Sequence, residues 1–220
     1  MIVLALDTAG VDCAAAVYDS GGKGDSVIWE VTETIGRGHA EHLMGVVDRA
    51  LAKANVALAA IERVVVTVGP GSFTGIRIGV AAARGFALSL SIPAVGVTTL
   101  EVMAAAAREN SAGRSVLAAI DAKREEIYLQ SFDADGAPLD EPRAVMIDEA
   151  RTIADGFDGI VTGTAVARLR GEPPPERPDA FPIAIVARLG ATKPVGEKPK
   201  PLYLRGPDAR PQAGYAVARV

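Results

Sequence analysis

A glycine-rich stretch at positions 69 to 79 has the residue types of a phosphate-binding loop, and it reads GPGSFTGIRIG. It follows an apolar, β-branched run and precedes a nearly uncharged helical pattern, which predicts a strand, a turn and a helix. Backbone N–H groups at such a helix start can bind an anion. Two familiar nucleotide motifs are excluded, because Ile76 stands where Walker A needs lysine and the glycines do not follow G-x-G-x-x-G spacing.

Two interpretations of this loop remain open on its residues alone. In the first, the glycines only permit a tight turn into the helix, and Ser72 or Thr74 caps its first turn. In the second, the backbone N–H groups and hydroxyls of Gly71, Ser72 and Thr74 bind an anion at the start of the helix.

Neither histidine spacing nor thiol context predicts a catalytic or metal site. His39 and His42 enclose Glu41 in the order H-A-E-H, which matches neither H-E-x-x-H nor H-x-x-E-H, and no third ligand is in view. We interpret them as polar residues at a helix start. Cys13 lies in an apolar strand pattern, which is typical of a buried structural thiol.

The paired carboxylates at Glu125 and Glu126 suggest acid–base chemistry, but Lys123 and Arg124 precede them. Such mixed charges are typical of a solvated turn. No residue is therefore predicted to be catalytic.

Composition narrows the class of protein. The chain has 220 residues, a net charge of −4 and one cysteine. Neither a basic field for nucleic acid nor a disulfide framework is expected, and a reducing cytoplasm fits. The N-terminus lacks the pattern of a signal peptide, and we expect no apolar run of the roughly 18–20 residues that a membrane span needs.

The elements that position these residues alternate between strand and helix. Helix 39–54 carries one apolar stripe at three- and four-residue spacing. The order of hairpins and crossovers predicts an α/β fold with a mixed sheet and helices on its faces. The predicted strands are 2–6, 13–18, 27–33, 64–68 and 94–97, and the other predicted helices are 76–90 and 100–109.

A second half repeats the start of the first. Strand patterns at 115–121 and 127–133 follow the same plan as the first two, and Asp121 and Asp133 lie 114 residues after Asp7 and Asp19. This spacing predicts a duplicated unit. Further on, 160–162 is a possible strand and 183–189 a helix. The proline-rich end has one apolar cluster, Leu202 to Leu204, which we expect to dock on the body while the last residues are mobile.

Helix 76–90 is apolar nearly all round, although a helix on a sheet surface needs only one apolar stripe. It must therefore be covered on more than one side. Either it lies between two layers of this chain, or it forms a subunit interface.

Five segments together resemble the bacterial TsaB (YeaZ) family. They are LALDTA, RGHAEHL, GPGSFTGIRIG, DAKREEIY and PLYLRGPDA, in this order, and they run from Met1 to about Ala209. The resemblance implies the actin-like ATPase (ASKHA) fold, with two ribonuclease-H-like subdomains of which the second is reduced. We expect subdomains at 1–110 and 111–192 and a tail at 193–220.

The resemblance also implies work in making threonylcarbamoyladenosine beside the tRNA anticodon. TsaD, a larger paralogue, transfers the threonylcarbamoyl group and holds a metal with H-x-x-x-H. This sequence has no histidine near Glu101 to Ala105, where that pair is expected. We therefore expect a non-catalytic scaffold without cofactor or metal. It would pair with TsaD, support TsaE, meet tRNA only indirectly and have no contact with a membrane.

The same resemblance implies two sets of site residues. A partner surface on helices 39–54 and 76–90 would pair with TsaD, or with a second copy when TsaD is absent. Its expected residues are His39, His42, Leu43, Val46, Val47, Ala50, Ile76, Val80 and Ala83. A vestigial anion or nucleotide site would comprise Asp7, Thr8, Gly69, Gly71, Ser72 and Thr74. A nucleotide-binding or hydrolysing enzyme of this fold and a direct tRNA-binding protein remain the alternatives.

Overall fold

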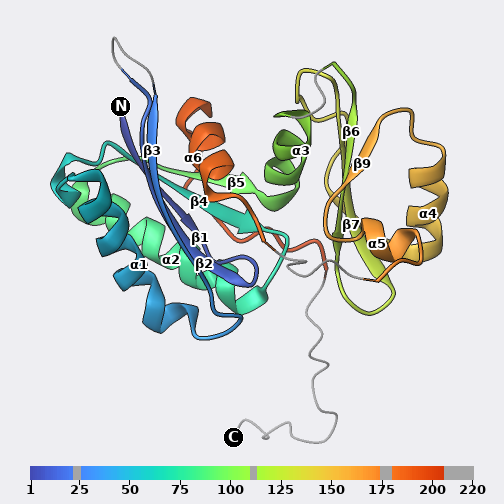
Figure 1. Ribbon diagram of the computed structural model, residues 1–220, viewed down its shortest axis with the longest axis horizontal. Helices are drawn as coiled ribbons and strands as arrows, with labels where there is room; N and C mark the ends of the chain where they lie inside the picture. The colour runs from blue at the N-terminus through green and yellow to red at the C-terminus, as the bar shows by residue number, and fades with distance from the viewer. Residues whose placement is uncertain (22–25, 110–112, 174–179, 206–220) are drawn as a thin grey trace, which may run out of the picture.

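The computed structural model describes residues 1–21, 26–109, 113–173 and 180–205. Two mixed sheets lie side by side, each with helices on its faces (Figure 1). Helix α3, Thr99–Glu109, lies between them and packs on the second sheet.

The first sheet has five strands in the order β3-β2-β1-β4-β5. The central strand β1 pairs antiparallel with β2 and parallel with β4, and β4 pairs parallel with β5. Both central strands are buried along almost their whole length, as expected for strands covered on both faces. The strand bounds are β1 Ile2–Asp7, β2 Asp12–Asp19, β3 Val27–Thr34, β4 Arg63–Gly69 and β5 Ala94–Thr98.

Three helices cover this sheet. Helices α1, His39–Ala54, and α2, Phe73–Leu90, lie on one face, and α6, Ile183–Thr192, lies on the other (Figure 1). The apolar stripe of α1 is buried against the sheet, as its spacing predicts, and α1 ends at Asn55 in the left-handed conformation. A single 3-10 turn, η1 (Leu58–Ala60), leads into β4.

The second sheet has four strands in the order β8-β7-β6-β9. Strand β6 contributes to two cores, because its side chains alternate between faces. Val116 and Ala118 belong to the core shared with the first half, and Leu117 and Ala119 to a smaller core of the second half. The elements are β6 Val116–Asp121, β7 Glu126–Phe132, β8 Arg143–Met146, α4 Ile147–Asp155, β9 Ile160–Thr162 and α5 Val166–Leu169.

The duplication predicted from the sequence is confirmed by topology. In both halves the first strand pairs antiparallel with the second and parallel with the fourth, and a helix joins the third to the fourth. The register corrects one detail: Ile2 pairs with Asp19, whereas Val116 pairs with Phe132. The second hairpin is thus one residue shorter, so Asp133 is not the equivalent of Asp19.

The course of the chain end differs from the expected division. Helix α6, assigned to the second subdomain, packs on the first sheet. Its Gly190 contacts Val65 so closely that an added Cβ would lie 2.2 Å from the valine side chain. The expected tail is described as far as Arg205, and residues 206–220 lie outside the described residues. The Leu202 to Leu204 cluster docks on the body as predicted: Leu202 and Leu204 pack against the core, and the Leu202 N–H donates to Val68 O at 2.8 Å.

Candidate functional site

The glycine loop connects β4 to α2 and is held against the β1–β2 turn. Ser72 is the N-cap of α2, and its Oγ accepts from the Gly75 N–H at 3.2 Å. The Ser72 N–H donates to Ala9 O at 2.7 Å. Its hydroxyl and its amide are therefore both engaged within the chain.

Three glycines at four-residue spacing let α2 approach the β1–β2 turn. A Cβ added at Gly71 would lie 2.4 Å from Ala9 O, and one at Gly75 would lie 1.9 Å from Thr8 O. At Gly79 it would lie 2.5 Å from Thr8 Oγ1, and that hydroxyl donates to Gly75 O at 2.7 Å. These contacts leave no room for a side chain, so close packing alone accounts for the glycines.

Asp7 is sealed beneath this junction. Its Oδ1 accepts from the Thr67 hydroxyl at 2.5 Å and from the Ala9 N–H at 3.0 Å. Oδ2 is buried without a hydrogen-bond partner among the described residues. Burial raises the pKa of Asp7 to about 6, although the Thr67 hydrogen bond opposes the shift.

A cavity of about 250 Å³ separates the two halves and contains part of the expected anion site. It brings together Gly71 and Ser72 with the end of β6, including Asp121 and Lys123. Asp7, Thr8, Gly69 and Thr74 are not among its lining residues. The six residues are therefore neighbours in the fold without converging on one space. Ligand pockets usually begin at roughly 300 Å³.

The described residues contain no cluster of three or more His, Cys, Asp or Glu side chains that could hold a metal ion. His39 is buried, and its Nε2 lies 3.1 Å from Asp12 O. His42 is exposed, and its Nδ1 lies 3.3 Å from the Glu33 carboxylate. The two rings thus point to different surroundings. Cys13 is fully buried, and burial raises its pKa to about 11.

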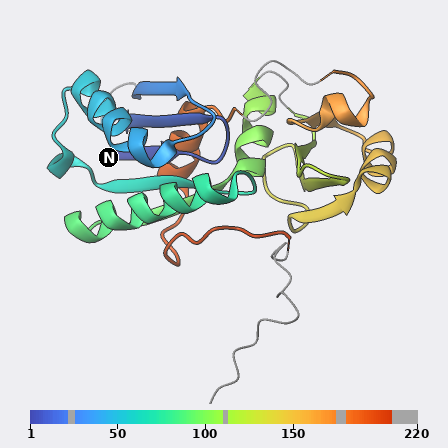
Figure 2. The same ribbon diagram turned by 90° about the horizontal axis from the view of Figure 1, so that it is seen from below.

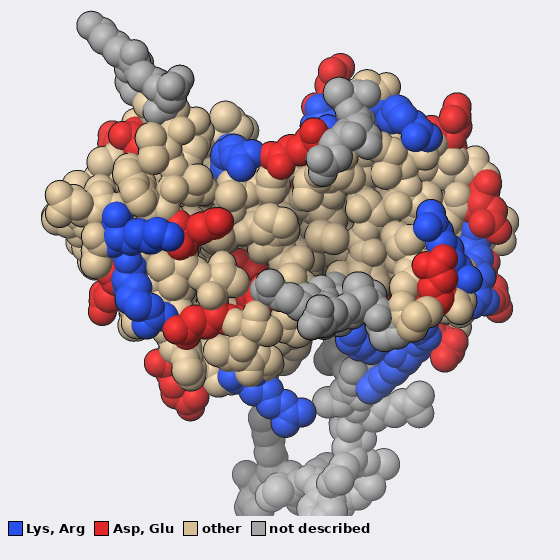
Figure 3. All heavy atoms as spheres, viewed as in Figure 1, with Lys and Arg blue, Asp and Glu red and all other residues tan. Residues whose placement is uncertain are grey.

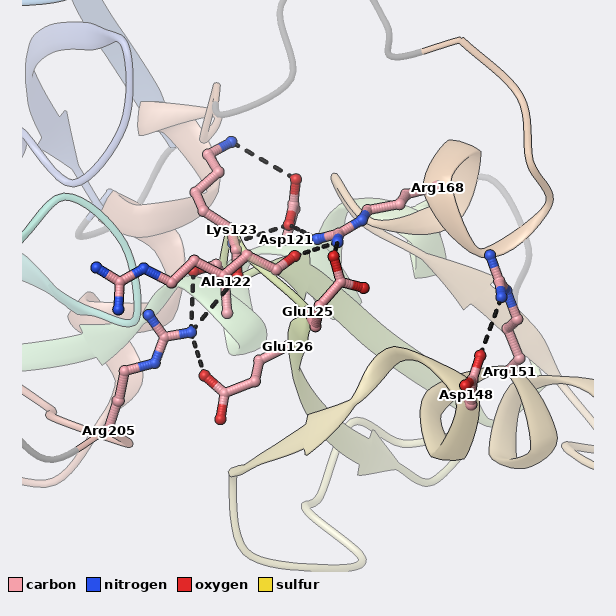
Figure 4. Close-up of polar contacts among 10 residues, drawn as sticks. Asp121, Ala122, Lys123, Glu125, Glu126, Asp148, Arg151, Arg168 and Arg205 are labelled. Atoms are coloured by element: carbon pink, nitrogen blue, oxygen red, sulfur yellow. Dashed lines mark hydrogen bonds and ion pairs between the residues drawn. The ribbon is translucent and has the colours of Figure 1, made fainter.

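The charged turn between β6 and β7 is held by two arginines from distant segments (Figure 4). Arg168 of α5 donates to Asp121 Oδ1 at 2.8 Å and to the Arg124 carbonyl. Arg205 pairs with Glu126 and lies 3.3 Å from Ala122 O. Lys123 and Arg124 are both left-handed, with φ of 60° and 56°, so these contacts stabilise an unfavourable backbone.

The expected partner residues need correction. Eight of the nine are buried in this chain's own core and are at most 5% exposed, so they cannot contact a partner. These are His39, Leu43, Val46, Val47, Ala50, Ile76, Val80 and Ala83. The apolar stripe that identifies a helix face in a sequence is the stripe that packs on the helix's own sheet. Only His42 of the expected set is exposed.

Helix α2 nevertheless presents a second surface, which is exposed and carries apolar, small and basic residues. We call the stripe Phe73, Arg77, Ala81, Arg84, Gly85 and Leu88 the outer face of α2, since all six residues are exposed. Phe73 and Leu88 are 55% and 80% exposed. The helix follows the underside of the first half (Figure 2). None of these positions is in the expected partner set, because their small or charged residues break the apolar periodicity.

By length and composition α2 could cross a membrane, which corrects the expectation that no apolar run is long enough. It is the one such helix in the part of the chain that the structure describes, and 28% of it is buried. Core helices of soluble proteins meet the same criterion, so this is weak evidence for a span. Arg77 and Arg84 lie on its exposed side.

Three residues from two segments form a cluster at the start of α2: Phe73 and Arg77 belong to the helix, and Tyr203 belongs to the C-terminal segment. The Arg77 guanidinium lies 3.7 Å from the Phe73 ring centroid, and Arg77 Nε donates to the Tyr203 hydroxyl at 2.7 Å. The Phe73 and Tyr203 rings are 5.4 Å apart. Sequence reasoning did not find this cluster; the segments GPGSFTGIRIG and PLYLRGPDA each contain part of it.

The chain and its fold match known proteins. A family model described as TsaD: tRNA N6-adenosine threonylcarbamoyltransferase matches residues 31–169. The tRNA threonylcarbamoyladenosine biosynthesis protein TsaB of Escherichia coli is 36% identical over 135 residues, which cover 61% of this chain and 56% of that protein. An uncharacterized protein of Mycobacterium tuberculosis is 35% identical over 217 residues, which cover 96% of this chain and 95% of that protein.

The structure of YeaZ from Pseudomonas aeruginosa superimposes with a TM-score of 0.73 and 26% identity, covering 92% of this chain and 99% of that one. The duplicated mixed sheets are those of the ASKHA fold. The sequence match spans little more than half the length of the E. coli relative, whereas the structural match spans nearly the whole of YeaZ. The family model covers more than half of this chain, and the relatives that match it are named TsaB and YeaZ, so this chain belongs to the TsaB (YeaZ) family.

Proposed function

We propose that this chain is a non-catalytic subunit of the machinery that makes threonylcarbamoyladenosine in tRNA, and that it pairs with TsaD through α1 and the outer face of α2. The observation that carries the proposal is this exposed helix surface of apolar, small and basic residues, without an acidic side chain, in a chain of the TsaB family. Exposed apolar patches of this kind mark interaction sites.

The chemistry of the outer face favours a partner helix. Ala81 and Gly85 are exposed one turn apart, and a Cβ added at Gly85 meets nothing within 4 Å. Small residues let a second helix approach closely. TsaD shares the subdomain according to the resemblance, so it would offer a matching helix pair, and a second copy of this chain would do so in its absence.

The internal use of the loop residues supports a non-catalytic role. The Ser72 and Thr8 hydroxyls are engaged with the backbone of α2, and Gly71 and Gly75 approach the β1–β2 turn. The Thr8 hydroxyl and the Ser72 N–H therefore donate within the chain and not to a charged ligand. Titration calorimetry with ATP and magnesium tests the nucleotide-binding alternative, and measurable binding would favour it.

Charge gives the tRNA-binding alternative little support. The net charge is −4, and acidic and basic side chains are interspersed on the face in Figure 3. Nucleic-acid binding needs clustered cations. In this proposal tRNA meets the chain only through the partner, and TsaE acts on the assembled pair.

The test is a threonylcarbamoylation assay with TsaD and TsaE, with and without this chain. We expect activity to depend on the chain, and Leu88→Asp to abolish both the pairing and the stimulation. Glu109→Gln is a matched surface control, because Glu109 pairs with Arg188 away from the outer face. Wild-type chain that neither binds TsaD nor raises its activity would refute the proposal.

A further inference from the structure

The start of α2 carries a guanidinium whose orientation is fixed while most of its donors stay open. Arg77 stacks on Phe73 and uses its Nε to donate to Tyr203. No ion pair or further hydrogen bond involves Arg77 among the described residues. Both terminal nitrogens therefore keep their N–H donors for a ligand.

A guanidinium held in this way suits a carboxylate. Its planar fork matches two carboxylate oxygens, and stacking against an aromatic ring removes much of the rotational freedom that binding would otherwise cost. Lysine in the same place would lack the fork.

Charge complementarity identifies where the carboxylate comes from. Helix α2 contains Arg77 and Arg84 but no Asp or Glu, so the outer face is apolar with positive charge only. Phe73 and Arg77 lie one turn apart on the stripe that continues through Ala81 to Leu88. A partner helix on this stripe would place its own end beside Arg77.

We propose that Arg77, oriented by Phe73 and Tyr203, is a binding site for an Asp or Glu side chain of the partner subunit. This inference rests on the proposed pairing with TsaD. It assigns the C-terminal segment a task, because that segment supplies Tyr203 to the site.

Arg205 is the positioning residue of this site. The segment from Lys193 to Arg205 runs beneath the first half towards the second (Figure 2). Lys193 pairs with Glu101 at 2.7 Å at one end, and Arg205 holds Glu126 and the carbonyls of Ala122 and Lys123 at the other. Tyr203 lies two residues before that anchor, so we expect loss of Arg205 to loosen it, while Leu202 still contacts the core on its other side. The turn between β6 and β7 thus has a role, because it binds Arg205 and so anchors the segment that carries Tyr203.

The experiment measures the dissociation constant for TsaD by calorimetry with full-length variants. We expect Arg77→Gln to weaken pairing about 10–30-fold and Arg77→Lys about 5–10-fold, because charge alone does not replace the fork. Arg151→Gln is the control, with the same change of charge on α4 and away from the outer face of α2, and we expect less than about a threefold effect.

Two further variants test the orientation. Tyr203→Phe removes only the hydroxyl that accepts from Arg77, and we expect pairing to weaken about 3–5-fold. Arg205→Ala should weaken it similarly, and the double variant should be no worse than the single ones, because both act through one contact. Hydrogen exchange of the free chain should show lost protection at Leu202 in Arg205→Ala, and Arg151→Ala, which removes the Asp148 bridge, should leave it intact.

The outcomes separate this inference from the function on which it rests. Wild-type chain that does not bind TsaD refutes the proposed function and this site with it. Wild-type binding that Arg77→Gln leaves unchanged, or that Arg151→Gln weakens equally, refutes the site alone. If Arg205→Ala lowers the melting temperature, Glu126→Gln tests the same anchor with less perturbation, and unchanged protection at Leu202 in both overturns the positioning role.

Discussion

Two glycines in α2 provide a matched test of why the loop is rich in glycine. A Cβ at Gly75 would lie 1.9 Å from the Thr8 carbonyl oxygen and 3.1 Å from Ser72 Oγ. A carbon and a carbonyl oxygen normally approach to roughly 3.3 Å, so Gly75→Ala forces α2 away from the β1–β2 turn by more than about 1 Å. Gly85 lies in the same helix with nothing within 4 Å.

The expected magnitude follows from the contacts that such a shift breaks. Losing the bond from Thr8 to Gly75 O leaves a buried hydroxyl without a partner, at about 1–3 kcal/mol. Overpacking adds about 1–3 kcal/mol. The higher helix propensity of alanine offsets up to about 1 kcal/mol of this loss. We expect Gly75→Ala to lower the free energy of unfolding by about 3 kcal/mol and Tm by about 6–12 °C.

The assay is urea unfolding followed by the fluorescence of Trp29, the single tryptophan, which packs against the core from β3. Gly85→Ala should raise the free energy of unfolding by about 0.5–1 kcal/mol, because it gains helix propensity without a clash. Equal stability of Gly75→Ala and wild type would refute the close-packing explanation. So would a loss in Gly85→Ala as large as that in Gly75→Ala.

Three other predictions concern charge and burial. Because burial raises the pKa of Asp7 from 3.8 to about 6, the folded chain binds this proton more tightly than the unfolded chain, and the free energy of unfolding should fall by about 2–3 kcal/mol between pH 4 and 6.5. Asp7→Asn should remove that part of the slope in urea titrations at several pH values. Val46→Asp buries an unpaired charge at a fully buried position and should cost about 4 kcal/mol, whereas Leu88→Asp should leave Tm within about 2 °C, as calorimetry can check. Cys13, buried and with its pKa raised to about 11, should react with a thiol reagent only after urea unfolds the chain; rapid reaction of the native chain would show that the strand opens.

Regular periodicity explains which elements were predictable. Helix α1 was predicted with its observed bounds, 39–54, because its apolar residues recur on one face. Helix α2 begins three residues earlier than predicted, since Ser72 and not a later residue caps it. Strand β8 and helix α4 were not predicted: α4 reads IDEARTIAD and buries only Ile147 and Ala150, too few for a clear stripe.

The repeat was recognised from two pairs of aspartates, of which one pair is structurally equivalent and the other is not. Asp7 and Asp121 both end the first strand of their half, so their 114-residue offset reflects the duplication. Asp19 and Asp133 share that offset only in sequence, because the second hairpin is one residue shorter. A hairpin register depends on turn length, which a strand pattern alone does not specify.

The candidate site was only partly predictable for a physical reason. Periodic apolar residues mark the side of a helix that faces its own sheet, so the sequence pointed to Val46 and Val80, which are buried. A surface for a partner consists of the helix residues that stay exposed after the apolar stripe has packed on the sheet. Its members, such as Ala81 and Leu88, share helical spacing but not an apolar character, so no apolar period marks them. Tyr203 reaches the site from a segment 126 residues after Arg77.

The fixed position of α2 is what connects the fold to the proposed function. An interface of few side chains gains affinity when those side chains are held in place beforehand, because less freedom is lost on binding. Gly71, Gly75 and Gly79 bring the helix against the β1–β2 turn, and the C-terminal segment fixes Arg77 from outside. Glycine and hydroxyl residues of this kind would bind phosphate in a nucleotide-binding relative. Here they would instead fix the position of α2, and a subunit that acts through contact requires such a fixed surface.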